Sequence, residues 1–191
     1  MNPHEAELQT LANTLAESVV AIFKEKGEMK FSKPPAPKLK SIIEYNGRMR
    51  ADGMEKFNNP TFVATVNFYL NAKEMEKHNA LGAVVVYIEQ GYVVDLLRLL
   101  KYPPVDDENM DALRDCCGTL CNIIAGRFKS AISSIGFIEL EMSAFASYRN
   151  TAPRGVEFCF KEYNKYEIEF YITDIKRLVI EMTMAPIPKR R

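Results

Sequence analysis

Two long stretches of the chain place apolar residues at the three- and four-residue intervals of an amphipathic helix. The first runs from Glu5 to Lys26 and the second from about Asp107 to Ile135. Successive helical residues are separated by about 100°, so this spacing gathers the apolar side chains on one face. Each stretch therefore predicts a helix that packs one side against a core. A shorter buried helix is predicted over Gly91 to Leu100, where Tyr102-Pro103-Pro104 stops it.

Other stretches are rich in Val, Tyr, Phe and Thr and are typical of strands. Asn46-Gly47 suits a tight hairpin turn, and Asn164-Lys165 is interpreted as a second turn. The polar segment Asn71 to Asn79 is expected to hold a helical turn. The predicted strands are Thr61 to Leu70, Leu81 to Ile88, Phe137 to Ala146, Val156 to Glu162, Tyr166 to Thr173 and Leu178 to Met184.

The length of the chain bounds the number of domains. With 191 residues, 47% of them hydrophobic, the chain has material for one well-buried core. We therefore predict a single domain over residues 1–191. Prolines make residues 32–38 a linker after the first helix, and residues 186–191 are expected to be a mobile tail because proline and repelling charges give them nothing to bury.

Charge and cysteine usage narrow the class of protein. Lys and Arg number 25 and so do Asp and Glu, so no global field favours nucleic acid or an anionic membrane. The longest apolar run, Ala83 to Ile88, is too short to insert into a membrane, and the N-terminal residues lack the pattern of a secretory signal. Three of the four cysteines lie on one helix, which is unlike a secreted disulfide framework. A cytoplasmic protein is the expectation.

The second long helix has an unusual polar face. Asp115, Thr119, Asn122 and Gly126 are spaced so that they share one exposed stripe, which we expect to meet a partner protein. Their side chains are short, and a glycine inside a helix costs about 1 kcal/mol relative to alanine. Such a glycine allows close backbone approach, either by a neighbouring strand of the same chain or by a partner. The sequence leaves these two explanations open.

Self-contained metal or hydrolase chemistry has little support. Cys117 and Cys121 are one helical turn apart, but His4 and His78 lie in other segments, so a four-ligand zinc site has no completion. We expect these thiols to pack as small apolar groups and expect no metal or cofactor. Phosphate-binding loops, nucleophile elbows and His-Glu-x-x-His helices are absent from the sequence.

Read in order, the stripe Asp115-x-x-x-Thr119-x-x-Asn122-x-x-x-Gly126 resembles the helix pattern of the CheC/CheX/FliY chemotaxis phosphatases. That pattern has Asp or Ser, then Glu four residues later, then Asn three residues later. The order of predicted elements from Thr61 to Met184 also resembles the family. The resemblance implies an α+β, CheC-like fold, in which a largely antiparallel sheet packs against the long patterned helix, the N-terminal helix and a short third helix.

The same resemblance implies a function in two-component signalling. In the family the helix binds a phosphorylated CheY-type receiver, whose Mg²⁺ takes part, and the asparagine positions the water that attacks the aspartyl phosphate; Asn122 matches it. Asp115 matches the acidic position, but Thr119 replaces the glutamate, and Met142-Ser143-Ala144 offers no equivalent of the family's proline. Three alternatives follow: a phosphatase, a receiver-binding module without catalysis, or a self-associating module, since the family includes homodimers.

Overall fold

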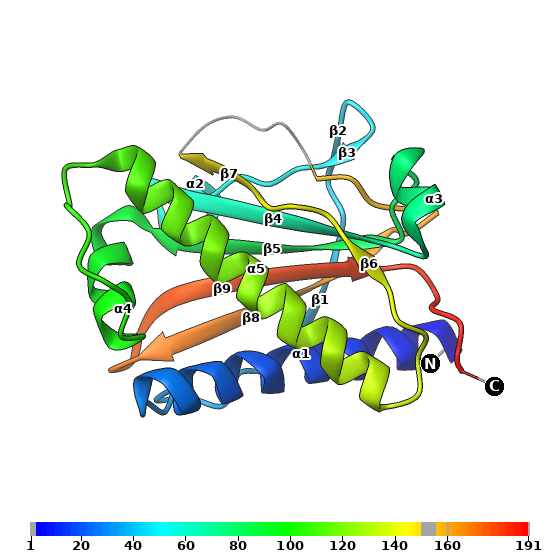
Figure 1. Cartoon of the computed structure of the whole chain (residues 1–191), viewed down its shortest axis with the longest axis horizontal. Helices are drawn as coiled ribbons and strands as arrows, with labels where there is room; N and C mark the ends of the chain where they lie inside the picture. The colour runs from blue at the N-terminus through cyan, green and yellow to red at the C-terminus, as the bar shows by residue number, and fades with distance from the viewer. Residues whose placement is uncertain (1–2, 150–155, 160, 191) are drawn as a thin grey trace.

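The computed structural model describes residues 3–149, 156–159 and 161–190, and its centre is one large antiparallel sheet (Figure 1). The strands of this sheet are β1 (Lys38–Ser41), β4 (Thr61–Tyr69), β5 (Gly82–Glu89), β6 (Glu141–Met142), β7 (Ala146–Arg149), β8 (Asn164–Ile172) and β9 (Ile175–Met184). Their order is β1-β8-β9-β5-β4-β6, and β7 also pairs with β4. Every pair is antiparallel, which confirms the expected α+β fold.

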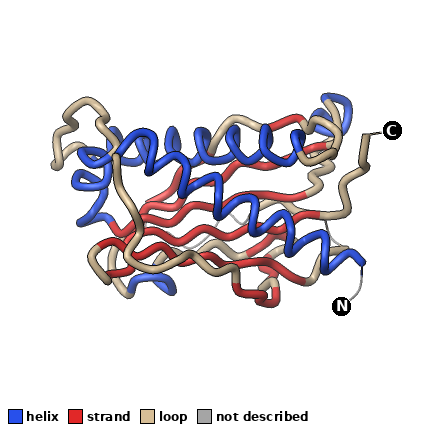
Figure 2. Tube along the Cα trace, turned by 90° about the horizontal axis from the view of Figure 1, so that it is seen from below, coloured by secondary structure: helices blue, strands red, loops and turns tan. Residues whose placement is uncertain are grey.

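Three helices cover one face of the sheet, namely α1 (Pro3–Gly27), α4 (Val93–Leu99) and α5 (Met110–Ser134). Figure 2 shows the long helices lying on one side of the strands. Their apolar faces and the facing side chains of the sheet form the main core, in which the rings of Phe68 and Phe128 meet edge to face at 5.8 Å. The short elements α3 (Ala72–Glu76) and the 3-10 turn Gln90–Tyr92 join neighbouring elements. None of the helices in the described ranges is long and apolar enough to cross a membrane.

The central strand β5 is buried on both of its faces. Val84, Val86 and Ile88 point into the helix-covered core, whereas Val85 and Tyr87 belong to a second apolar cluster on the opposite face. Side chains of a strand alternate between the two faces of a sheet, so a strand covered on both sides needs apolar residues at every position. This position in the fold explains the continuous apolar run in the sequence.

The opposite face is covered by smaller elements, the hairpin of β2 (Glu44–Tyr45) and β3 (Arg48–Met49), and the short helix α2 (Met54–Phe57). Below them lies a group of buried charges. Glu181, which is fully buried, accepts hydrogen bonds from Lys56 at 2.6 Å and from the Tyr87 hydroxyl at 2.6 Å, and its carboxylate lies 2.7 Å from the Lys165 ammonium. Lys56 thereby ties α2 to the middle of the sheet.

Glu167 extends this group of charges toward the edge of the sheet. It accepts hydrogen bonds of 2.5 Å from both Lys40 and Lys56. Burial disfavours the charged carboxylate, but the two lysine ammonium groups outweigh burial and lower the pKa of Glu167 to about 2. The pKa of Lys56 is raised, because the charges of Glu181 and Glu167 outweigh its own burial. The face opposite the helices is thus held by a mutually satisfied set of lysines and glutamates.

Three local predictions about the strands were wrong. The stretch Phe137 to Ala146 is not one strand, since it holds only β6 and the first residue of β7. Val156 makes one isolated bridge with Met49, and the described residues that follow it, up to residue 162, form no strand. Asn164-Lys165 lies inside β8 rather than in a turn, because Lys165 is neutralised by Glu181; the turn falls at Thr173-Asp174, where φ is 49° and 62°. The turn at Asn46-Gly47 is confirmed, but its hairpin forms a separate two-stranded sheet.

The proline-rich segment and the tail both lie against the folded body. Residues 28–37 have neither helix nor strand, and Ser32 donates its backbone N–H to the Tyr171 carbonyl at 2.9 Å. The mobility of the tail stays a prediction, but the tail does have a side chain to bury. Ile187 is 4% exposed and its N–H donates to Glu7 at 3.1 Å, and Arg190 donates its N–H to the Gly136 carbonyl at 2.8 Å. Ile187 gives the tail an apolar side chain to bury between α1 and the end of α5.

Candidate functional site on helix α5

Helix α5 begins and ends at recognisable caps. The side chain of Asn109 accepts a hydrogen bond of 3.0 Å from the Ala112 N–H, so the helix begins at Met110 rather than at the predicted Asp107. At the other end Gly136 has a φ of 100°, which glycine adopts without strain. The 25 residues between the caps cross the face of the sheet diagonally (Figure 1).

The two sides of α5 differ as the helical period predicts. Asp115, Thr119 and Asn122 are exposed, and Gly126 is half-buried on the same side. The opposite side is buried in the main core through Leu113, Cys117, Leu120, Ile124 and Phe128. Ile135, the last residue of the predicted helix, is 49% exposed, because the helix ends at Ser134 and the chain turns there.

The exposed side chains are not engaged within the molecule. No side-chain hydrogen bond or ion pair joins Asp115, Thr119 or Asn122 to any other residue in the described ranges. A rise of 1.5 Å per residue separates Asp115 from Asn122 by about 10 Å along the helix axis. The stripe therefore presents a carboxylate, a hydroxyl and a carboxamide to the solvent over about two turns, with their hydrogen-bonding capacity unused.

The two glycines of α5 occupy contrasting environments. A Cβ atom added to Gly126 would meet nothing within 4 Å, so no neighbouring strand of this chain requires a glycine there. A Cβ atom on Gly118 would lie 2.2 Å from the ring of Phe145. Gly118 is therefore the glycine that internal packing requires, and sequence analysis did not single it out. Of the two explanations for Gly126, the internal neighbour is removed.

Residues on both sides fix the position of the stripe. On one side Arg127 makes a two-pronged ion pair with Glu25 of α1, with hydrogen bonds of 2.7 and 3.2 Å. On the other side Phe145 packs over Gly118, and the loop that carries it is pinned to β4 by Ser143, whose N–H donates to the Asn67 carbonyl at 2.9 Å. These contacts hold α5 from two directions while leaving its exposed side open.

The cysteines of α5 lie outside this stripe. Cys117 and Cys121 are buried in the core, which agrees with their predicted packing as apolar groups, and burial raises the pKa of both thiols. Cys116 is partly exposed, and burial together with the negative charge of Asp115 raises the pKa of its thiol. Thiolates are the form that binds metals, so these cysteines are poorly suited to that role. Within the described ranges no three His, Cys, Asp or Glu side chains are grouped as metal ligands.

No protein-family model matches the sequence, and no curated protein matches it significantly. Solved structures do match. The chemotaxis protein CheX from Vibrio vulnificus has a TM-score of 0.57 at 14% identity, with 91% of this chain and 97% of that chain covered. FliY from Thermotoga maritima has a TM-score of 0.57 at 13% identity, with 97% and 93% covered.

A third solved structure is a complex. CheX from Borrelia burgdorferi, solved with CheY, BeF3 and Mg²⁺, has a TM-score of 0.51 at 10% identity, with 91% of this chain and 97% of that chain covered. Likeness at such low identity and nearly full coverage establishes the architecture. The chain therefore has the fold of the CheX and FliY chemotaxis proteins, which is the fold that the resemblance of residues 115–126 implied.

Proposed function

We propose that the protein binds a phosphorylated CheY-type receiver through the exposed stripe of α5 and that Asn122 promotes hydrolysis of the receiver's aspartyl phosphate. The observation that carries the proposal is the unpartnered set Asp115, Thr119 and Asn122 on one exposed helix face. The shared fold supports it, because the Borrelia burgdorferi CheX structure contains CheY with BeF3, a mimic of a phosphoryl group, and Mg²⁺. A receiver partner also implies a cytoplasmic location.

The proposed hydrolysis requires few groups from this chain. The receiver supplies the phosphoryl group and the Mg²⁺ ion that neutralises its charge, so no metal or cofactor is needed here. A carboxamide both donates and accepts hydrogen bonds, so the Asn122 side chain orients a water molecule for in-line attack on phosphorus without titrating. The water oxygen forms a bond to phosphorus, the bond to the aspartyl oxygen breaks, and aspartate and inorganic phosphate are released, with the water's proton passing to phosphate or solvent.

The other stripe residues would position the receiver. Asp115 offers a carboxylate one turn before Thr119, where it can pair with a cationic side chain of the partner. Gly126 has open space above its Cα atom, so a partner's backbone can approach the helix closely there. The cost of a helical glycine, about 1 kcal/mol, is then offset in the complex rather than in the free protein.

A second candidate function is receiver binding without catalysis. The observation that favours it is Thr119, whose short neutral side chain stands where the resemblance places a glutamate. A hydroxyl cannot make the charge-assisted contact that a carboxylate makes, so the receiver would be held with less orientation of its active site. Under this alternative the protein prolongs or reads the phosphorylated state rather than ending it.

A phosphate-release assay with the receivers of the source organism separates the two candidates. The unmodified protein should accelerate loss of phosphate from its cognate receiver, and Asn122→Ala should remove the acceleration while Asn13→Ala, an exposed asparagine on α1, should keep it. An unchanged rate in Asn122→Ala would rule out the catalytic role. Binding without acceleration, together with a gain of activity in Thr119→Glu, would favour the second candidate.

We also propose that two copies associate through the edge strand β1. Leu39 in β1, Ile43 just after β1 and Tyr163 just before β8 are 51%, 52% and 73% exposed, and β1 is one of the terminal strands of the sheet in the described part of the chain. An exposed edge with apolar side chains favours pairing with another strand. Sedimentation of the unmodified protein should show a dimer that Leu39→Lys dissociates, and a monomer at every concentration would contradict this.

A further inference from the structure

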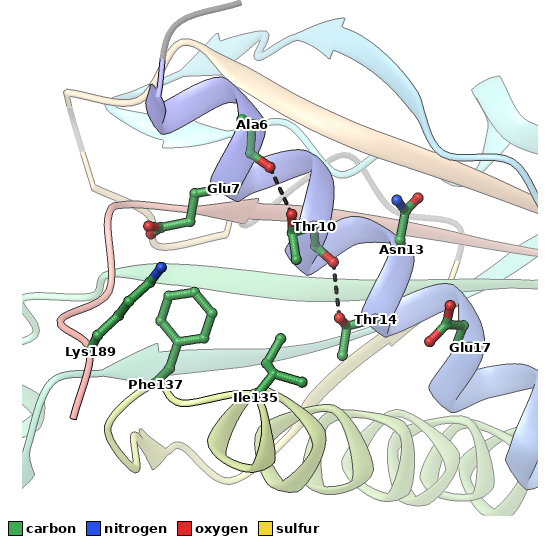
Figure 3. A pocket seen from close by; sticks show the side chains of 9 residues that line it. All are labelled: Ala6, Glu7, Thr10, Asn13, Thr14, Glu17, Ile135, Phe137 and Lys189. Atoms are coloured by element: carbon green, nitrogen blue, oxygen red, sulfur yellow. Dashed lines mark hydrogen bonds between the residues drawn. The ribbon is translucent and has the colours of Figure 1, made fainter. Parts of the chain in front are cut away.

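A groove lies away from the stripe of α5, between α1 and the end of α5 (Figure 3). Its volume is about 690 Å³. From α1 it is lined by Glu7, Thr10, Thr14 and Glu17, which follow one another at helical intervals. The opposite wall is formed by three residues beyond the end of α5, Ile135, Phe137 and Lys189. Neither the proposed phosphatase activity nor the edge strand uses this groove.

The α1 wall offers mainly hydrogen-bond acceptors; the exception is Asn13, whose Oδ1 accepts from Gln9 and whose amide N–H groups are donors. The Thr10 hydroxyl donates its proton to the Ala6 carbonyl and the Thr14 hydroxyl donates to the Thr10 carbonyl, both at 2.9 Å (Figure 3). Each hydroxyl has only one proton, so both oxygens can only accept from a ligand. Glu7 and Glu17 are carboxylates, and Glu17 has no hydrogen-bond or ion-pair partner in the described ranges. The two carboxylates and the two hydroxyl oxygens favour a ligand that brings donors and positive charge.

The opposite wall combines an apolar surface with a negative helix end. The side chain of Ile135 is 49% exposed, next to the buried ring of Phe137. The last turn of α5 contains no basic residue, so the partial negative charge at its C-terminus is not neutralised from within the helix. The tail partly compensates, because the Arg190 guanidinium donates to Ser133 in that turn. This wall of the groove therefore favours a ligand that has an apolar group next to a positive charge.

The chain itself already places one cation in the groove. The Lys189 ammonium lies 5.6 Å from the centre of the Phe137 ring, and Figure 3 shows its side chain extended beside that ring toward α1. An ammonium over an aromatic face is favourable, and more so near a carboxylate. Lys189 shows that a cation is accommodated at the Glu7 end, while the Glu17 end, ten residues and about 15 Å further along α1, holds none.

We propose that this groove binds a cationic amphipathic segment of a partner protein. An apolar side chain of the segment lies on Ile135, one Lys or Arg pairs with Glu17, and a second competes with Lys189 for the Glu7 end. An anionic membrane surface is disfavoured because the two carboxylates would repel it. The stripe of α5 and this groove are then two separate protein-binding surfaces on the helix-covered side of the molecule.

The test uses the full chain and a defined probe, an amidated amphipathic peptide whose helix carries lysines on one face and leucines on the other. Titration at low salt should give saturable binding, with amide NMR shifts concentrated at Thr10, Thr14 and Ile135. The double variant Glu7→Gln, Glu17→Gln should bind roughly tenfold more weakly, as expected for two lost exposed ion pairs. Glu76→Gln, which removes an exposed carboxylate on α3, is the matched control and should bind like the unmodified protein.

A third variant changes affinity in the opposite direction. Lys189→Ala removes the competing cation, so the peptide should bind roughly threefold more tightly. Circular dichroism of each variant should match the unmodified protein, because glutamine keeps the acceptor that Glu7 offers to the Ile187 N–H. Equal affinity for all variants, equal binding of a peptide with glutamate in place of lysine, or shifts confined to residues outside the groove would overturn the proposal.

Discussion

The two faces of the sheet use polar residues in opposite ways. On the far face Lys165, Glu167 and Glu181 are buried, Lys56 is half-buried, and the four satisfy one another. On the helix-covered face the core is apolar, and the stripe side chains Asp115, Thr119 and Asn122 of α5 lie outside it without partners among the described residues. The difference separates the residues for stability from those for function. Paired polar groups stabilise the fold, whereas unpaired polar groups on a rigid helix are available to bind another protein.

The largest effect on the free energy of unfolding is expected from a substitution in the buried charge group of the far face. Glu181→Gln removes a fully buried carboxylate, so the buried Lys165 ammonium loses its carboxylate partner and Lys56 keeps only Glu167. The free energy of unfolding, measured by urea denaturation, should fall by about 3–5 kcal/mol. The matched control is Glu89→Gln, whose partner Arg177 lies 3.4 Å away near the surface, and which should change it by less than about 1 kcal/mol. Equal effects for the two variants would mean that the buried charges do not hold the sheet.

The same group should make stability depend on acid pH. The pKa of Glu167 is about 2 in the folded protein and 4.5 in the absence of these contacts, so below pH 4.5 the unfolded state binds more protons than the folded state. The stabilisation is fully present above pH 4.5 and is lost as the pH falls toward 2. Allowing for solvent screening, roughly 2 kcal/mol of the free energy of unfolding should disappear over this window. Glu167→Gln should flatten the profile, and an unaltered slope would contradict the assignment.

The glycines of α5 sharpen the comparison within one helix. Gly118→Ala drives a methyl group into the ring of Phe145, so the free energy of unfolding should fall by about 1–3 kcal/mol. The same substitution at Gly126 meets open space and should raise it by about 0.5–1 kcal/mol. Both values follow from thermal or urea denaturation.

The substitution at Gly126 should change receiver binding in the opposite direction to the stability of the protein. If Gly126 allows a receiver to approach, the stabilised Gly126→Ala variant should bind the activated receiver more weakly than the unmodified protein, as measured by calorimetry. If Gly126→Ala is more stable and binds the activated receiver with the same affinity as the unmodified protein, Gly126 has no part in the interface.

The features that were predicted correctly from the sequence are those that local patterns of residues determine. The exposure of Asp115 and Asn122 and the burial of Cys117 follow from the 100° step of a helix. Enrichment in Val, Tyr, Phe and Thr located β4, β5, β8 and β9. The exposed edge strand β1 escaped notice because none of Lys38–Ser41 is buried, so it carries no apolar pattern.

The remaining differences arise from contacts between distant segments. The sequence did not distinguish Gly118 from Gly126, because the ring that packs on Gly118 belongs to Phe145, which lies far along the chain, just before β7. Lys165 looked like part of a turn, because its partner Glu181 lies on the next strand. Such pairs have no signature in the spacing of nearby residues, since the physical cause is tertiary burial.

The central claim is that the exposed stripe of α5 is the surface that meets a phosphorylated receiver. Its most direct test is an amide NMR footprint of the full-length protein titrated with its cognate CheY-type receiver, with and without BeF3 and Mg²⁺. The activated receiver should perturb the amides of residues 115–126 and leave the far face around Glu181 unchanged, and the unactivated receiver should perturb neither. Perturbation confined to residues outside α5, or identical footprints for both forms of the receiver, would contradict the account.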